Sequence, residues 1–372
     1  MNFKQNFCIL FILIILTTQI QSVLAEDLQC TVQLEEKGTI SSGSVIFDLY
    51  VANNLLYFLD KGGFNIYNVT DISQISFVGE YSSPYAHDLH IDTQENLAYI
   101  LDPKDGLMVL DIQDPQNPLE LSKYIEVSGT NFFINDDLLF LGDEENGLKI
   151  LDTSNSSKLT LVASWSDLEN NSVGGIFVYN PYAFLGLRSP NIDGPPTPLE
   201  LQVLNIGDLE DISEVCEVFN SSDDYAGGSP SYLNEELLII SDYSKGVKFI
   251  DFSDPSNPTL INTYNDGGEA NDLKAVNDYL FVVDGLDGLE ILDISDLNNI
   301  KEIGSISLSY YMARIDIVTS TNLLYLGGVC SGIKIIEYSI NKDVNKASAS
   351  GFLIGFLIPI VIVVYRNKIK KE

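Results

Sequence analysis

The residues of this sequence best suited to chemistry are four aspartates that precede short apolar segments: Asp48, Asp88, Asp272 and Asp316. Apolar runs bounded by turn residues are typical of β-strands, so we expect each aspartate to be the first residue of a strand. Carboxylates gathered in one place favour a hard cation such as Ca²⁺ and disfavour anionic ligands. The alternative is structural, because aspartate also caps turns by accepting hydrogen bonds from the local backbone.

Two histidines flank one of these aspartates, and the chain contains no others. His87 and His90 are three residues apart, so on a strand they face opposite sides and cannot hold one metal ion together. The chain also lacks a Gly-x-Ser-x-Gly sequence, the motif that carries the nucleophile of many hydrolases. We therefore predict a protein that is not an enzyme and has no cofactor, with Ca²⁺ as the exception that the aspartates leave open.

Three loops rich in aspartate and glycine, at residues 102–106, 143–147 and 284–288, resemble calcium-binding loops at first sight. They lack the Asp-x-Asp-x-Asp-Gly spacing and the final glutamate of such loops. Their recurrence at one position of a repeat indicates hairpin turns in which glycine adopts a left-handed conformation.

A repeat of about 44 residues must position all of these groups. Its central motif, Gly-apolar-x-apolar-apolar-Asp, occurs with variations at residues 63–68, 106–111, 147–152, 246–251, 288–293 and 332–337, with a degenerate copy at 200–205. An apolar run precedes each copy, and turn-forming segments such as Asp251-Phe-Ser-Asp-Pro-Ser-Asn-Pro258 follow. Four short strands in a repeat of this length are typical of a β-propeller blade.

The distribution of the fourth strands indicates how the ring closes. The first candidate, at residues 35–40, precedes the first complete repeat, whereas the last repeat, near residues 316–340, has no fourth strand after it. The simplest arrangement places residues 35–40 in the last blade. We therefore predict an all-β, seven-bladed β-propeller over residues 26–341 that its N-terminal strand closes, which leaves no unpaired sheet edge.

Some of these motifs are those of a known family. The segments 147–152 (Gly-Leu-Lys-Ile-Leu-Asp), 288–296 (Gly-Leu-Glu-Ile-Leu-Asp-Ile-Ser-Asp) and 253–258 (Ser-Asp-Pro-Ser-Asn-Pro) resemble the LVIVD-repeat proteins. The resemblance covers nearly all of residues 30–340 and implies a cell-surface or secreted propeller. It implies no catalytic residues. The fourth blade departs from the pattern, because Glu200 replaces the glycine of the motif.

The two ends of the chain indicate secretion and membrane anchoring. Residues 1–25 combine a positive charge, an apolar run and a small-residue cleavage site, as signal peptides do. After a linker at 342–346, residues 347–365 carry no charge and are numerous enough for a single transmembrane helix. The tail at 366–372 is basic, so we expect it in the cytosol and the propeller outside. This predicts a type I protein of the plasma membrane or a secretory-pathway membrane, and the last five residues resemble a dilysine signal for early secretory retention.

Charge and surface motifs limit the partners of the propeller. A formal net charge of -33 repels phosphates, so we expect no nucleic-acid partner. Sequons for N-glycosylation start at Asn68, Asn155, Asn170 and Asn220. A proline-rich insertion in the fourth blade is either a neutral insertion or a recognition loop. The candidate recognition residues are Arg188, Asn191, Asp193, Pro195 and Pro196.

These features together favour a membrane-anchored binding module that contacts a protein partner through one face. That face, the top face, carries the loops that precede each innermost strand and the loops between second and third strands. The alternatives are a cation-dependent enzyme that uses the acidic mouth of the ring, and a structural or adhesive coat protein. An enzyme requires a deep pocket with converging carboxylates, whereas a binding module requires an exposed aromatic or proline-rich patch.

Overall fold

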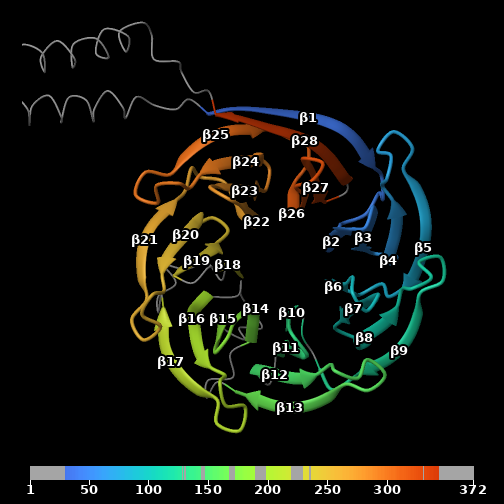
Figure 1. Cartoon of the computed structure of the whole chain (residues 1–372), viewed down its shortest axis with the longest axis vertical. Helices are drawn as coiled ribbons and strands as arrows, with labels where there is room; N and C mark the ends of the chain where they lie inside the picture. The colour runs from blue at the N-terminus through green and yellow to red at the C-terminus, as the bar shows by residue number, and fades with distance from the viewer. Residues whose placement is uncertain are drawn as a thin grey trace, which may run out of the picture. The chain divides into compact units, whose positions relative to one another are not determined.

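The computed structural model describes residues 30–127, 129, 131–143, 147–166, 172–188, 198–218, 229–233, 236–329 and 331–342. Over this part of the chain the secondary structure consists of 28 strands. They form seven four-stranded sheets, which the compact unit Leu34–Ser339 arranges as a ring around a central axis (Figure 1). The all-β, seven-bladed propeller predicted from the repeat is therefore confirmed.

The first three sheets follow the chain in order. The first contains β2 (Asp48–Ala52), β3 (Leu55–Asp60), β4 (Gly63–Asn68) and β5 (Ser76–Ser82). The second contains β6 (Asp88–Asp92), β7 (Leu97–Asp102), β8 (Gly106–Asp111) and β9 (Leu119–Tyr124). The third contains β10 (Asn131–Asn135), β11 (Leu138–Asp143), β12 (Gly147–Asp152) and β13 (Thr160–Trp165).

The remaining sheets continue this order until the last one. The fourth contains β14 (Ser172–Tyr179), β15 (Tyr182–Arg188), β16 (Pro198–Asn205) and β17 (Ser213–Val218). The fifth contains β18 (Ser229–Leu233), β19 (Leu237–Ser241), β20 (Val247–Asp251) and β21 (Thr259–Tyr264). The sixth contains β22 (Ala270–Val276), β23 (Tyr279–Asp284), β24 (Gly288–Asp293) and β25 (Lys301–Ile306).

The seventh sheet joins the two ends of the ring. It contains β26 (Met312–Val318), β27 (Leu323–Gly328) and β28 (Gly332–Lys342), and its outer strand is β1 (Cys30–Ile40), in the order β1-β28-β27-β26. The predicted closure by the N-terminal strand is therefore confirmed. Outside that compact unit, the described residues are 30–33, at the start of β1, and 340–342, at the end of β28.

Local sequence determines the hairpins. In the first, second, third, sixth and seventh blades, the turn between the first and second strands uses Asn or Asp in a left-handed conformation, for example Asn96 with φ 56° and Asn277 with φ 54°. In five of the seven blades the third strand begins with the glycine of the motif, which has φ 96° at Gly288 and φ 73° at Gly332. At both positions a Cβ atom would overlap the backbone of the adjacent fourth strand. Glycine is therefore required at these turns by conformation and by space, as the repeat predicts.

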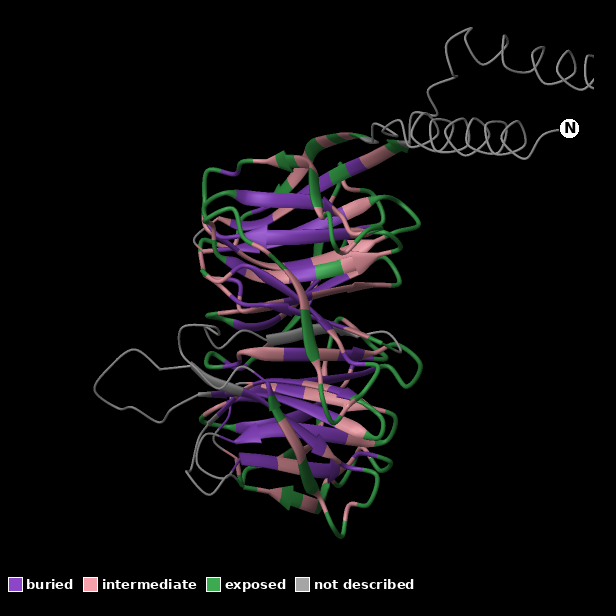
Figure 2. Cartoon of the chain, turned by 90° about the vertical axis from the view of Figure 1, so that its left-hand side faces the viewer, coloured by how far each residue is buried: buried purple, intermediate pink, exposed green. Residues whose placement is uncertain are grey.

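The hydrophobic core lies between neighbouring sheets. One cluster packs Tyr57 and Ile66 of the first sheet against Ile100 and Met108 of the second. Another packs buried residues of the seventh sheet, such as Ile335, against the first sheet. Figure 2 shows the same distribution, with buried residues in the strands and exposed residues in the loops. Neighbouring sheets bury apolar area against each other. Because the ring is closed, every one of the seven sheets is covered on both faces.

The predictions for the chain ends lie largely outside the described residues. Residues 1–25 and 347–365 are not among them. Within the described part, no helix has the length and apolar character that a membrane span requires. The signal peptide, the transmembrane helix and the cytosolic tail therefore stay predictions.

Candidate functional site on the top face

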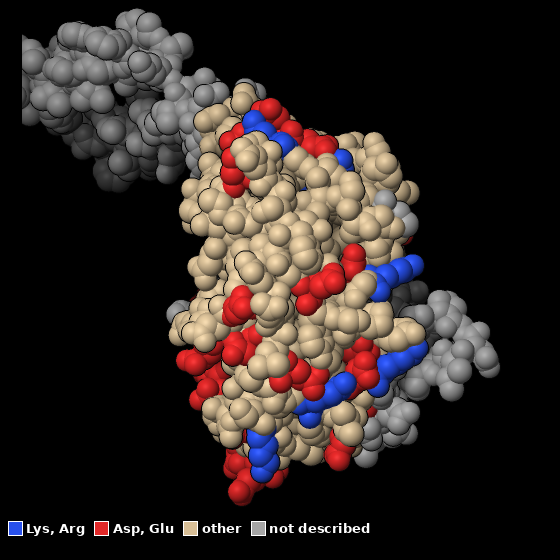
Figure 3. Space-filling model, turned by 90° about the vertical axis from the view of Figure 1, so that its right-hand side faces the viewer, with Lys and Arg blue, Asp and Glu red and all other residues tan. Residues whose placement is uncertain are grey.

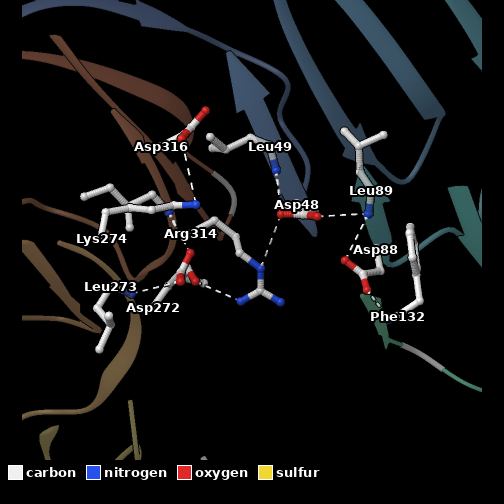
Figure 4. A network of polar contacts seen from close by, with 12 residues as sticks. Asp48, Leu49, Asp88, Leu89, Phe132, Asp272, Leu273, Lys274, Arg314 and Asp316 are labelled. Atoms are coloured by element: carbon white, nitrogen blue, oxygen red, sulfur yellow. Dashed lines mark hydrogen bonds and ion pairs between the residues drawn. The ribbon is translucent and has the colours of Figure 1, made fainter. Parts of the chain in front are cut away.

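The innermost strands carry a repeated polar contact between neighbouring blades. Asp48 accepts hydrogen bonds from Leu49 N (2.9 Å) in its own strand and from Leu89 N (2.9 Å) in the next sheet. The same two kinds of bond recur at Asp88 and Asp272. The bonds between sheets there are Phe132 N to Asp88 Oδ2 at 2.6 Å and Ile315 N to Asp272 Oδ2 at 3.0 Å. Each carboxylate thus links the start of one innermost strand to the next blade (Figure 4).

The seventh blade differs from the sequence-based prediction. Asp316 was expected to begin its innermost strand, but β26 begins at Met312 and β22 likewise begins at Ala270, ahead of Asp272. Both strands carry the same β-bulge near the start, but the turn after β26 has four residues, 319–322, whereas the turn after β22 has two, 277–278. Counting by a constant repeat therefore lands two residues too far along β26. As a result Arg314 occupies the place in the seventh blade that Asp272 occupies in the sixth.

Arg314 is a cation among the aspartates. Its Nε lies 4.0 Å from Asp48 Oδ1, and Figure 4 shows its guanidinium directed between Asp48 and Asp272. Asp316 lies further along β26, where it accepts a hydrogen bond from Val51 N (2.7 Å). Lys274 Nζ lies 3.9 Å from Asp316 Oδ1. The structure therefore surrounds the four predicted ligands with N–H donors and two basic side chains.

Burial is the largest cause of raised pKa values at three of these carboxyls, those of Asp48, Asp88 and Asp316. Burial is the largest cause at Asp88, whose pKa is well above its ordinary value, and the neighbouring Asp48 raises it further. Burial also raises the pKa of Asp48, which the positive charge of Arg314 partly offsets. These groups serve as hydrogen-bond acceptors between blades. This geometry favours the structural alternative over the Ca²⁺ site. The hydrogen bonds and ion pairs of the four aspartates are explained without a bound cation.

The two histidines have separate surroundings. His87 stacks on Phe47, with ring centroids 4.6 Å apart, whereas His90 lies 6.3 Å from the ring of Tyr99. His90 also lines a cavity of about 260 Å³ together with Asp92 and Asp137. That cavity lies among turns of the face opposite the top face. Burial lowers the pKa of both histidines.

A group of acids that the sequence analysis missed lies between the fifth and sixth blades. Asp266 lies in the loop before β22, Asp284 ends β23 and Glu290 lies in β24. One carboxylate oxygen from each lies within 4.8 Å of the others. Burial, followed by hydrogen bonding to Asp266, raises the pKa of Glu290 to about 8. Burial, followed by the charge of Asp266, raises the pKa of Asp284 to about 6. One feature of the sequence identifies the group: Glu290 stands where the copies of the third and fifth blades have lysine.

Large apolar side chains are exposed in the loops of the top face. Leu286 is 72% exposed and Ile125 is 73% exposed, and Tyr85 and Tyr310 are each nearly half exposed. Lys104 Nζ lies 3.3 Å above the ring centroid of Tyr85. An exposed aromatic and aliphatic surface of this kind is typical of protein contact sites.

The remaining predicted surface sites are partly visible. Asn68 ends β4 and Asn155 lies after β12, and both are exposed. Asn170 and Asn220 lie outside the described residues. Of the predicted recognition loop, Arg188 ends β15, and Asn191, Asp193, Pro195 and Pro196 lie outside the described part. Glycosylation and recognition by this loop stay predictions.

Comparison with known families identifies the repeat. The sequence profile of the LVIVD repeat matches residues 85–126, 131–167, 234–266 and 267–307. The propeller contains LVIVD repeats. The four matches fall in the second, third, fifth and sixth blades, so the resemblance drawn from the motifs is confirmed there. No curated protein matches the chain.

Solved structures similar to the LVIVD propeller share its architecture. The WD40 β-propeller domain of Doa1 has 11% identity and a TM-score of 0.60, with 82% of this chain and 97% of that chain covered. The N-terminal domain of Nup159 has 12% identity and a TM-score of 0.56, covering 83% and 96%. The computationally designed Ika8 protein has 10% identity and a TM-score of 0.57, covering 81% and 99%. At such low identities, the likeness concerns the fold alone.

Proposed function

We propose that the LVIVD propeller is a binding module, anchored in a membrane through residues 347–365, that contacts a protein partner with its top face. The observation that carries this proposal is the exposure of Tyr85, Ile125, Leu286 and Tyr310 in top-face loops. Isolated exposed apolar residues are ordinary, but here all four come from loops of one face.

Two of these residues lie on loops that a backbone hydrogen bond joins. Met312 N donates to Gly285 O at 2.9 Å, which holds the loop of Leu286 beside the loop of Tyr310. Leucine and tyrosine on loops fixed in this way lose little conformational entropy when a partner covers them. The pair is therefore the centre of the proposed contact surface.

The electrostatics favour a partner with basic groups. The chain carries a formal net charge of -33, and Asp and Glu cover more of the side drawn in Figure 3 than Lys and Arg do. Charge of one sign accelerates encounter with a partner of opposite sign and repels nucleic acid. We place the propeller outside the cytosol, as the predicted signal peptide and the exposed sequons Asn68 and Asn155 support.

The contacts of the innermost strands support binding rather than catalysis. Asp48, Asp88 and Asp272 accept hydrogen bonds from backbone N–H groups of the next blade. A general acid or base needs a carboxyl that is free to exchange protons with substrate. An enzyme with these residues at its centre would have to give up contacts between blades.

Proximity labelling on intact cells tests the proposal with the full-length chain. The top-face variant Leu286→Ser/Tyr310→Ser is compared with the outer-strand variant Phe77→Ser/Leu260→Ser. Each variant replaces two exposed apolar side chains. We expect the proteins labelled by the wild type to be lost with the top-face variant and retained with the outer-strand variant. Equal labelling by both variants would contradict a top-face contact and favour the coat or enzyme alternative.

A further inference from the structure

Two positions, one at the end of the second strand and one in the third strand, lie next to each other in blade after blade. The last residue of the second strand, or the one just after it, is an aspartate in most blades, and the third residue of the third-strand motif lies beside it. In the third blade Lys149 Nζ lies 2.7 Å from Asp143 Oδ2, and in the fifth Lys248 Nζ lies 3.0 Å from Asp242 Oδ2. A buried carboxylate is stable only when a cation or donors compensate it, and lysine does so here.

The third blade shows where the positive charge sits. Lys149 Nζ also donates to Glu126 O, in the loop that leads from β9 into that blade. The ammonium group thus bridges the aspartate that ends the second strand and the incoming loop. Glu126 follows Tyr124, the last residue of β9, by two positions.

The sixth blade has the same geometry with the opposite charge. Asp284 corresponds to Asp143, and Asp266, two residues after Tyr264 at the end of β21, corresponds to Glu126. The position of the lysine is taken by Glu290. The blade therefore places three carboxylates around the point where the third blade holds an ammonium group.

Two carboxylate oxygens of this group are buried without a partner. Asp284 is 3% exposed and Glu290 is 5% exposed, and Asp284 Oδ1 and Glu290 Oε2 are buried without a hydrogen-bond partner. Both residues line a cavity of about 10 Å³, the size of one water molecule or ion. The described residues that line it include neither Lys nor Arg. In the first blade, by contrast, Asn65 Nδ2 donates to the equivalent Asp60 Oδ1 at 3.1 Å.

We propose that Asp266, Asp284 and Glu290 form a binding site for one hard divalent cation, with Ca²⁺ as the probe, between the fifth and sixth blades. Carboxylate oxygens are the ligands that such cations prefer. The cation takes the place that the lysine ammonium group holds in the third blade. It also joins the loop before β22 to β23 and β24, so it fastens two neighbouring blades at the top face.

The site is separate from the four aspartates of the innermost strands, and it does not depend on the proposed partner. A second possible occupant is a proton shared between the carboxyls, which needs no metal. The two occupants differ in one respect that an experiment can measure: only a cation site binds a metal ion saturably.

Luminescence of Tb³⁺, a Ca²⁺ analogue, tests the proposal on the full-length chain after treatment with EDTA. Tyr264 lines the cavity and can sensitise an ion bound there. We expect saturable emission that Ca²⁺ displaces, with Mg²⁺ and Mn²⁺ titrations assigning the preferred cation. Absence of saturable, Ca²⁺-displaceable emission from the wild type would overturn the proposal and leave the shared proton as the occupant.

The variant Glu290→Lys recreates the pair of the third and fifth blades within the sixth. We expect it to lose saturable Tb³⁺ emission while its thermal midpoint in EDTA equals or exceeds that of the wild type. The control Glu80→Gln removes one exposed carboxylate from the first blade and should leave emission unchanged, which excludes a general effect of charge. Retained binding by Glu290→Lys would overturn the proposal. Should that variant fail to fold, Glu290→Gln takes its place. We expect Glu290→Gln to weaken the affinity for Tb³⁺ about tenfold or more. An unchanged affinity would overturn the proposed site.

Discussion

Lys334 Nζ lies 2.7 Å from Glu36 Oε1, although the two residues are 298 positions apart in the chain. Lys334 belongs to β28 and Glu36 to β1, so this ion pair crosses the contact at which the ring closes. A second pair, Lys37 with Glu337 at 2.8 Å, crosses the same contact with the charges reversed. Exposed pairs of this kind contribute little to stability, so they select the register while apolar packing supplies most of the stability.

The closing contact is sensitive to the size of one residue. A Cβ atom on Gly332 would overlap Ile40 O, and Gly332 also has φ 73°. We expect Gly332→Ala to lower the free energy of unfolding by about 2 to 4 kcal/mol, because overlap adds to backbone strain. Thermal or denaturant unfolding of the full-length chain measures the change.

Gly43→Ala is the matched control for this prediction. Gly43 has a similar φ of 64°, but no atom lies within 4 Å of a Cβ at that position. We expect a loss of about 1 kcal/mol from strain alone. Equal losses for the two variants would show that β1 does not press against Gly332.

Arg314 should stabilise the ring through the aspartates beside it. Arg314→Met leaves Asp48 and Asp272 without the cation, so we expect a loss of about 1 to 2 kcal/mol. The value lies below that of a fully buried pair because 39% of the arginine side chain is exposed. The exposed Lys61→Met is the control and should change the unfolding free energy by less than about 0.5 kcal/mol. A loss for Arg314→Met no larger than that of the control would contradict this role.

The raised pKa of Asp88 predicts a pH dependence of stability. Burial and the charge of Asp48 make the folded state bind the proton more tightly than the unfolded chain does. Stability from this group is therefore fully present below the unfolded pKa of 3.8 and is lost as pH rises through the raised, folded pKa. Asp88→Asn keeps an acceptor oxygen and does not titrate, so it should gain stability relative to the wild type as pH rises. Unfolding curves across acidic and neutral pH measure the difference, and a constant difference would contradict the prediction.

The exposed sequons predict glycans at Asn68 and Asn155 if the propeller enters the secretory pathway. Each side chain lies at a turn on the surface, where an enzyme can reach it. We expect Asn68→Gln and Asn155→Gln each to remove one glycan from the protein purified from a eukaryotic host, as intact mass measures. Unmodified asparagine at both sites would contradict the predicted compartment.

The sequence predicts the ring because the features that form it are local. Most blades repeat a glycine at the start of the third strand and Asn or Asp at a hairpin, and these conformational requirements are visible without any neighbour. The position of Arg314 was not predictable by counting along the repeat, because the turn between β26 and β27 is two residues longer than the turn between β22 and β23. The acidic group was missed for another reason: Asp266 and Glu290 meet only when the fifth blade packs against the sixth.

Hydrogen–deuterium exchange of the full-length chain tests ring closure by β1 most directly. Leu34–Ile40 forms the outer strand of the seventh sheet, as Leu119–Tyr124 does in the second. We predict that alternate amides of Leu34–Ile40 exchange as slowly as those of Leu119–Tyr124. Exchange of Leu34–Ile40 at the rate of an unstructured peptide, with the other outer strands still protected, would contradict the closed ring.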